Sequence, residues 1–132
     1  MFERKSISTR VAVAATLLAA PLAVYADILA GVGYGGPRQT QAVCYLFNAG
    51  PGNVNITSKS IHPEFGTSLP ASVYDTCGTS ISPGNVCAFV ANIPTGGGNA
   101  CRIVLSPSGA NVRGRLELRD VSGEVLNAVE LR

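Results

Sequence analysis

Four cysteines are the residues of this chain best suited to chemistry, namely Cys44, Cys77, Cys87 and Cys101. Cysteine thiols can bind a metal, carry out redox exchange or form structural disulfides. Zinc ligands typically occur in pairs separated by about two to four residues, and redox pairs typically follow a Cys-x-x-Cys pattern. Neither spacing is present, and the chain has a single histidine. We therefore expect disulfides and no metal or other cofactor.

Residue alternation favours one of the three pairings that four cysteines allow. Cys44 shares its side of a predicted strand with Leu46, and Cys101 shares its side with the aliphatic residues that follow it. Both thiols are therefore expected to point into one core. Cys77 and Cys87 flank the Pro-Gly turn of CGTSISPGNVC and can close it locally. The favoured pairing is Cys44–Cys101 with Cys77–Cys87, and the other two pairings stay open.

The only histidine, His62, is the residue around which a hydrolytic site could form. Ser58, Ser60 and Glu64 lie close to it in the sequence. A Ser-His-acid triad needs three groups that converge in space, which neighbours along one strand do not supply. Because Pro63 follows, we expect His62 in a loop or at the surface. The chain is predicted not to be an enzyme, with a small hydrolase as the remote alternative.

The run GVGYGG, at Gly31–Gly36, has the spacing of a Gly-x-Gly-x-x-Gly phosphate-binding turn. A dinucleotide site needs a strand before this turn and a helix after it. Pro37 and β-like sequence follow here, so we interpret the match as accidental. Segment 27–39 is predicted to be a Gly-rich N-terminal arm, either loose or an irregular edge strand. A functional variant of this prediction is that the arm adds as a strand to the sheet edge of a neighbour.

Three arginines near the end of the chain mark a possible binding face. Arg113, Arg115 and Arg119 share one side of a predicted strand with Glu117. Such a face could bind an acidic ligand or a protein partner. The alternative is a solvated face whose charges discourage aggregation at a sheet edge.

The first 26 residues have the three-part pattern of a secretory signal peptide. Arg4, Lys5 and Arg10 form a basic start. The apolar run Val11–Ala26 has 16 residues, fewer than the roughly 20 that cross a bilayer. Val24–Ala26 fits the small-x-small cleavage pattern. The signal helix, within residues 1–26, is predicted to be removed, which leaves a secreted or periplasmic protein without a membrane segment.

Removal of the signal changes the charge of the chain. Three of the ten Lys and Arg residues and one of the eight Asp and Glu residues belong to the signal, so seven of each remain and the net charge is zero. Nucleic-acid-binding proteins usually depend on a clear excess of positive charge. No nucleic-acid partner is therefore expected. The mature length suits a single small domain.

After the signal, short β-rich runs alternate with clusters of Gly, Pro and Asn, the pattern of an all-β sandwich. About seven strands are predicted, at 40–48, 53–61, 86–93, 100–106, 111–120 and 124–132, with a short edge strand within 68–76. The expected fold is a two-sheet antiparallel sandwich with two disulfides over residues 40–132.

The CGTSISPGNVC segment resembles bacterial immunoglobulin-like domains of the abnormal-spindle/Hydin type. These domains often carry Cys-Gly, then an aliphatic-x-Pro-Gly turn and a second Cys, positions held here by Cys77, Gly78, Ile81, Pro83, Gly84 and Cys87. The resemblance runs from Gln41 to Asp120 and includes CYLFNAGPGNVNITSKSI. The spacing of Phe89 and Pro94 departs from the family's Phe-x-Pro, and Cys44 and Cys101 are not part of its usual pattern.

The resemblance implies an immunoglobulin-like sandwich without a catalytic site, because such domains mostly serve in adhesion, as scaffolds or in interactions. We expect an exported structural or binding module. Its partner would be a protein, bound through an edge strand or through the arginine face. The alternative is an assembly subunit of a bacterial surface appendage or adhesin, which would use the arm or an open edge strand.

Overall fold

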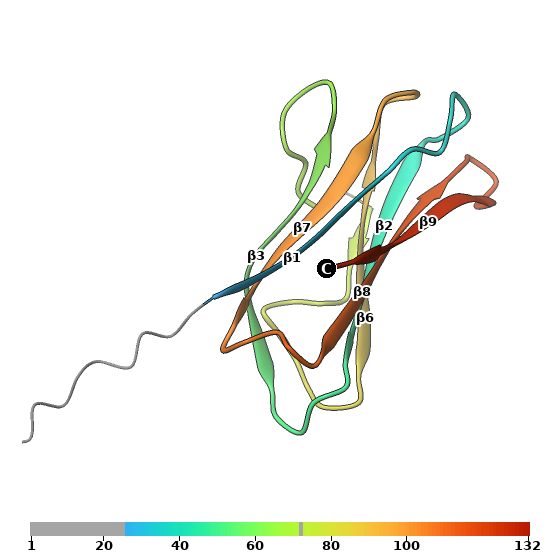
Figure 1. The fold of residues 1–132 in the computed structure, drawn as a ribbon. Coiled ribbons are helices and arrows are strands. Elements are labelled where there is room, and N and C mark those ends of the chain that lie inside the picture. Colours follow the sequence, from blue (N-terminus) through green and yellow to red (C-terminus); the bar gives the residue numbers. More distant parts are fainter. Residues whose placement is uncertain (1–25, 72) are drawn as a thin grey trace, which may run out of the picture.

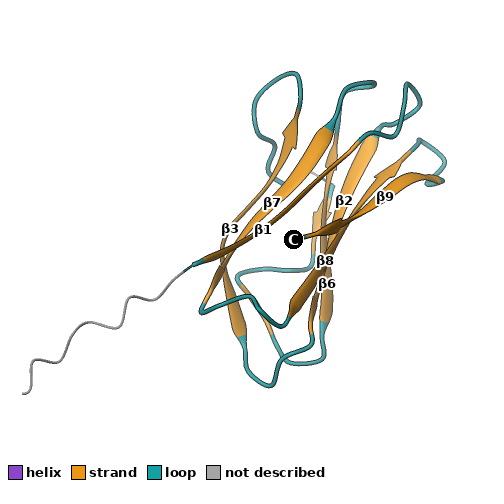
Figure 2. Ribbon diagram, viewed as in Figure 1, coloured by secondary structure: helices purple, strands orange, loops and turns teal. Residues whose placement is uncertain are grey.

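The protein folds as a β-sandwich of two antiparallel sheets (Figures 1 and 2). The computed structural model describes residues 26–71 and 73–132, so the predicted signal lies outside the described residues except for Ala26. Within the described part, nine strands are present and no helix. The predicted all-β two-sheet sandwich is therefore confirmed.

The two sheets differ in size. The four-stranded sheet has the order β1 (Asp27–Gly33), β7 (Asn99–Ser106), β3 (Val54–Pro63) and β5 (Ser80–Ile81). The five-stranded sheet has the order β4 (Tyr74–Asp75), β6 (Val86–Asn92), β2 (Gln41–Asn48), β8 (Val112–Arg119) and β9 (Val125–Leu131). All seven predicted strands are present, with β4 inside the expected edge segment. The two-residue strand β5 was not predicted, because so short a strand has no alternation to detect.

The Gly-rich segment is a regular strand, so the prediction of a loose arm is wrong and its alternative, an edge strand, is observed. β1 pairs with β7 along all seven of its residues. Ala30 also exchanges two backbone hydrogen bonds with Arg132, of 3.0 and 2.9 Å. The sandwich consequently starts at Asp27 and not at residue 40.

The glycines of β1 have a packing role. A Cβ atom on Gly31 would lie 2.8 Å from Cδ2 of Leu131, and one on Gly33 would lie 3.2 Å from Cγ2 of Val129. Both glycines face β9 of the other sheet, so larger residues would separate the two strands. Close approach of β1 to β9, and not backbone freedom, accounts for the alternating glycines.

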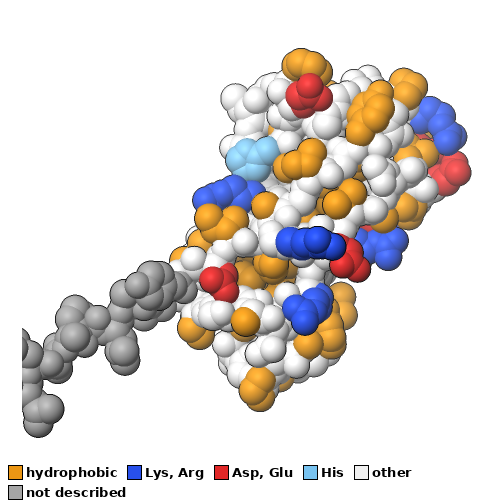
Figure 3. Space-filling model, viewed as in Figure 1, with side chains coloured by type: hydrophobic (Ala, Val, Ile, Leu, Met, Phe, Trp, Pro, Cys, Tyr) orange, Lys and Arg blue, Asp and Glu red, His pale blue; other side chains and the backbone are white. Residues whose placement is uncertain are grey.

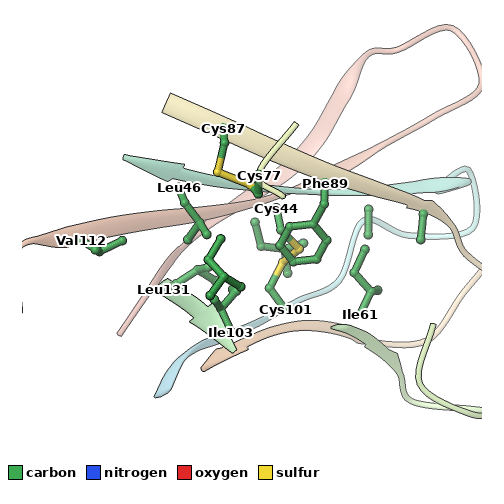
Figure 4. Packing of buried hydrophobic residues seen from close by; sticks show 14 of the residues in the cluster. Cys44, Leu46, Ile61, Cys77, Cys87, Phe89, Cys101, Ile103, Val112 and Leu131 are labelled. Atoms are coloured by element: carbon green, nitrogen blue, oxygen red, sulfur yellow. A yellow bond between two sulfur atoms is a disulfide. The ribbon is translucent and has the colours of Figure 1, made fainter. Parts of the chain in front are cut away.

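The disulfides tie the sandwich together in the favoured pairing (Figure 4). Cys44 and Cys101 are fully buried and join β2 to β7 across the two sheets, with Cα atoms 6.2 Å apart. The ring of Phe89 packs beside this bond in the core. Cys77 lies between β4 and β5, where the chain crosses from one sheet to the other, and its bond to Cys87 attaches this crossover to β6.

Two buried amide side chains fix the loops at the ends of β2. Gln39 donates hydrogen bonds from Nε2 to the carbonyls of Gly96 and Gly97, at 2.8 and 2.9 Å. At the other end, Asn48 donates from Nδ2 to the carbonyl of Ile81 in β5, at 2.9 Å. Both amides are 0% exposed, so each bond satisfies a group that would otherwise be buried without a partner.

Candidate binding surface

The predicted arginines lie on the outer face of the five-stranded sheet. Within β8, the odd-numbered positions point outward, because Val112, Leu116 and Leu118 are at most 2% exposed and belong to the core. Arg113 and Arg115 are exposed on the outer face, as the alternation predicts.

A ladder of ion pairs engages two of the three arginines, and Arg119 more fully than Arg115, because their side chains are 27% and 55% exposed. Glu117 lies between Arg115, whose Nε is 3.2 Å from Oε1, and Arg119, whose Nε donates to Oε2 at 3.1 Å. Arg119 also donates to the hydroxyl of Tyr45 at 2.9 Å, and its guanidinium lies 5.9 Å from the centre of that ring. The hydrogen bond to Glu117 raises the pKa of Arg119 above its ordinary value. Arg119 therefore serves the sheet itself, which narrows the possible binding face to Arg113 and Arg115.

Arg113 is the arginine least committed to the fold. Its guanidinium donates to the carbonyl of Ala110 at 3.3 Å, and it forms no ion pair with a described residue. A cation with only one neutral acceptor keeps most of its donors for another molecule.

Exposed apolar side chains lie beside Arg113. Phe47 of β2 is the cross-strand neighbour of Arg113 on one side and of Val86 in β6 on the other. Phe47 is 39% exposed and Val86 is 65% exposed. Apolar residues occupy both sides of segment 40–48, as is typical of a central strand, and β2 lies in the middle of the five-stranded sheet. The exposure of Phe47 was missed, because alternation alone does not say how far a sheet extends.

These side chains surround a shallow hollow of about 270 Å³. Tyr45, Phe47, Val86, Arg113 and Arg115 line it and are called the Phe47–Arg113 surface below. Gly114, which also lines the hollow, belongs to the inward-facing positions of β8 and offers only backbone there. The hollow is thus lined by aromatic rings of β2 and guanidinium groups of β8, and Leu46, Glu130 and Leu131 complete its lining.

The outer face of the four-stranded sheet carries the predicted histidine. His62 lies in β3, one residue before its end, and is half-buried on the outer face, so of its two expected places, a loop and the surface, the loop is not observed. Its Nε2 atom is 2.7 Å from Oγ of Ser60. Glu64 instead accepts a hydrogen bond from the backbone N–H of Gly98 at 2.7 Å, and no carboxylate of the described residues bonds to His62. A Ser-His pair without an orienting acid lacks the third member of a triad.

The sheet edges are largely covered by the chain itself. On β6, Thr76 donates its backbone N–H to the carbonyl of Ala88 at 2.9 Å, and its hydroxyl accepts from the N–H of Ala88 at 2.9 Å. On β3, the inward-pointing Lys59 forms an ion pair with Asp75 of the other sheet at 2.7 Å. An inward-pointing charge and a bonded edge both hinder the addition of a further strand.

Comparisons with protein-family models, with curated proteins and with solved structures find no match for this chain. The resemblance to immunoglobulin-like domains of the abnormal-spindle/Hydin type therefore stays a prediction. Among residues 26–71 and 73–132, no three His, Cys, Asp or Glu side chains lie close enough to hold a metal ion. No helix of the described part is long and apolar enough to cross a membrane.

Proposed function

We propose that this protein is an exported, non-enzymatic β-sandwich that binds another protein through the Phe47–Arg113 surface. The observation that carries the proposal is the cross-strand row Val86, Phe47, Arg113, in which two exposed apolar side chains adjoin a cation without an ionic partner. Rigid aromatic side chains and arginine are the residue types most enriched at the centres of protein interfaces.

Export is supported by the chemistry of the fold. Two disulfides are consistent with an oxidising compartment. Cleavage after Ala26 would leave every described strand intact, because β1 begins at Asp27. The carboxylate of Asp27 accepts hydrogen bonds from Ser108 Oγ and from the N–H of Gly109, both at 2.7 Å, so the new terminus would be anchored.

The geometry favours a binding module over an appendage subunit that assembles through its N-terminal arm. β1 already pairs with β7 of its own chain. Its inward positions after Asp27 are Leu29, Gly31 and Gly33, which bring few apolar atoms with which to fill a groove in a neighbour. A strand that binds by insertion depends on such side chains for specificity.

A capture experiment tests the proposal. The mature protein, with its first residue established by mass spectrometry, is immobilised and exposed to the secreted or periplasmic fraction of the source organism. We expect a protein that is retained by the wild type and by Val32→Ser but released by Phe47→Ser. Val32 is a matched control, because it is 68% exposed on the other sheet. Retention that is equal on all three proteins, or retention of nothing, would contradict the proposal.

A further inference from the structure

The chemistry of the partner can be read from the charges around the hollow. Arg113, Arg115 and Glu130 line the hollow where β8 begins and β9 ends, and Asp27 and Arg132 line an adjoining hollow together with Arg113 and Glu130. Figure 3 shows cationic groups gathered around an acidic one near the C-terminus of the described chain. Among the described residues, Arg115 has an ionic partner in Glu117, and no ion pair is formed by Arg113 or Arg132. Arg113 is thus a cation without a described ionic partner beside the apolar side chains of the hollow, although the mature chain as predicted is neutral.

The apolar side of the hollow limits the partner further. Phe47 and Val86 are neighbours on adjacent strands, and Tyr45 lies next to Phe47 on the same side of β2. An inorganic anion would use the arginines and leave these side chains in water. A side chain with its own apolar surface would bury them, which is favourable because apolar area is removed from water.

We propose that the Phe47–Arg113 surface binds a segment of another protein in which an acidic residue adjoins an aromatic or aliphatic one. This inference rests on the proposed function and names the chemistry of the partner. The carboxylate accepts hydrogen bonds from the guanidinium of Arg113, whose planar donor pairs match a carboxylate. The apolar side chain packs on Phe47 and Val86.

Peptide selection tests this chemistry without knowledge of the natural partner. Random peptides displayed on phage are selected on immobilised mature protein and counter-selected on the double variant Phe47→Ser, Arg113→Gln. We expect the enriched peptides to contain Asp or Glu beside Phe, Tyr, Trp, Leu or Ile. Enrichment of peptides without acidic residues, or no enrichment at all, would overturn the inference.

Affinities of one enriched synthetic peptide then assign the contacts. Fluorescence polarisation should show a loss of about tenfold or more for Phe47→Ser and for Arg113→Gln. The matched controls Val32→Ser and Arg102→Gln, on the outer face of the four-stranded sheet, should change affinity by less than about twofold. Replacing the acidic residue of the peptide by its amide should weaken binding to the wild type but hardly to Arg113→Gln. Equal losses on both proteins would reject the contact between Arg113 and the carboxylate.

Two further measurements distinguish a lost contact from a misfolded variant, and a peptide-like partner from a second copy of this chain. Thermal unfolding followed by circular dichroism shows whether each variant remains folded before its affinity is interpreted. Sedimentation tests self-association, and a dimer that dissociates on Phe47→Ser would replace the peptide-like partner by a second copy of this chain. If a captured natural partner depends on Phe47 but binds equally well to Arg113→Gln, the proposed function stands and the acidic chemistry is rejected.

Discussion

The outer faces of the two sheets follow the same alternation but are covered to different degrees. On the five-stranded sheet, Val43 and Val90 are each only 1% exposed, although they point away from the other sheet and no described strand covers them. On the four-stranded sheet, Ile28 and Val32 are 52% and 68% exposed. The difference shows that an outward-facing residue becomes buried where it lies in the middle of a wide sheet.

Neighbouring long side chains complete this cover on the five-stranded sheet. Tyr45 packs against the cluster of Val43 and Val90 and bonds to Arg119, which in turn is held by Glu117. On the four-stranded face, the described side-chain contacts are short-range ones, such as that between Ser60 and His62. A small outer core with an ionic border therefore supports the Phe47–Arg113 surface, while the other face remains ordinary solvated sheet.

The largest expected effect is a difference in unfolding free energy between variants on the outer faces of the two sheets. Val43→Ala should lower the free energy of unfolding by about 2 kcal/mol, because it removes two buried methyl groups and leaves a cavity. Val32→Ala should change it by less than about 0.5 kcal/mol, because its side chain is already in water. Urea denaturation measures both. Equal effects would mean that the outer core of the five-stranded sheet does not exist.

The next largest effect on stability tests the ion pairs of Glu117 with Arg115 and Arg119, which border the outer core. Glu117→Gln should cost about 1 kcal/mol of unfolding free energy, because Glu117 is 12% exposed and bridges Arg115 and Arg119. Glu130→Gln on the neighbouring strand is the matched control, since Glu130 forms no ion pair with a described residue. If Glu130→Gln lowers the unfolding free energy as much as Glu117→Gln does, the ion pairs of Glu117 do not stabilise the sheet.

A smaller effect depends on pH and concerns the turn between β8 and β9. Hydrogen bonds from Ser122, with a further one from the N–H of Glu124, hold the pKa of Asp120 below its ordinary value. The folded state thus favours the carboxylate, which stabilises the protein above the unfolded pKa of about 3.9. This contribution disappears as the pH falls through the lower folded pKa.

Asp120→Asn checks the sign of that effect. Thermal unfolding should show a lower Tm for the variant at neutral pH and a difference that shrinks as the pH falls below about 4. A difference that grows in acid would contradict the assignment.

The last prediction is an unchanged rate of hydrolysis, and it concerns the outer face of the four-stranded sheet. Ser60→Ala should leave the hydrolysis of p-nitrophenyl acetate unchanged, because no acid orients His62. A wild-type rate well above that of free imidazole, abolished by Ser60→Ala, would restore the hydrolase alternative.

Alternation along single strands made most of the fold predictable. It placed Cys44 and Cys101 in one core and put the three arginines on one side of β8. Pairing between distant strands carries no such local signal. The contact of Gly31 with Leu131 joins strands that lie far apart in the sequence. The sequence around Gly31 therefore could not distinguish a closely packed strand from a loose arm.

The candidate surface was predictable only in part, for the same reason. Arg113 was identified from its own strand, but its neighbour Phe47 lies more than sixty positions earlier and meets it only through the register of β2 and β8. The engagement of Arg119 with Tyr45 also depends on that register. Buried amides such as Gln39 gave no signal, because a polar residue before a strand usually indicates a loop.

The most direct test of the binding surface is photo-cross-linking in the source organism. A photoreactive phenylalanine analogue is placed at Phe47 in one variant and at Val32 in another. Both positions are exposed, but they lie on different sheets. We expect light to yield a discrete protein adduct from position 47 and none from position 32. Adducts from position 32 alone, or none from position 47, would contradict the conclusion that the Phe47–Arg113 surface binds another protein.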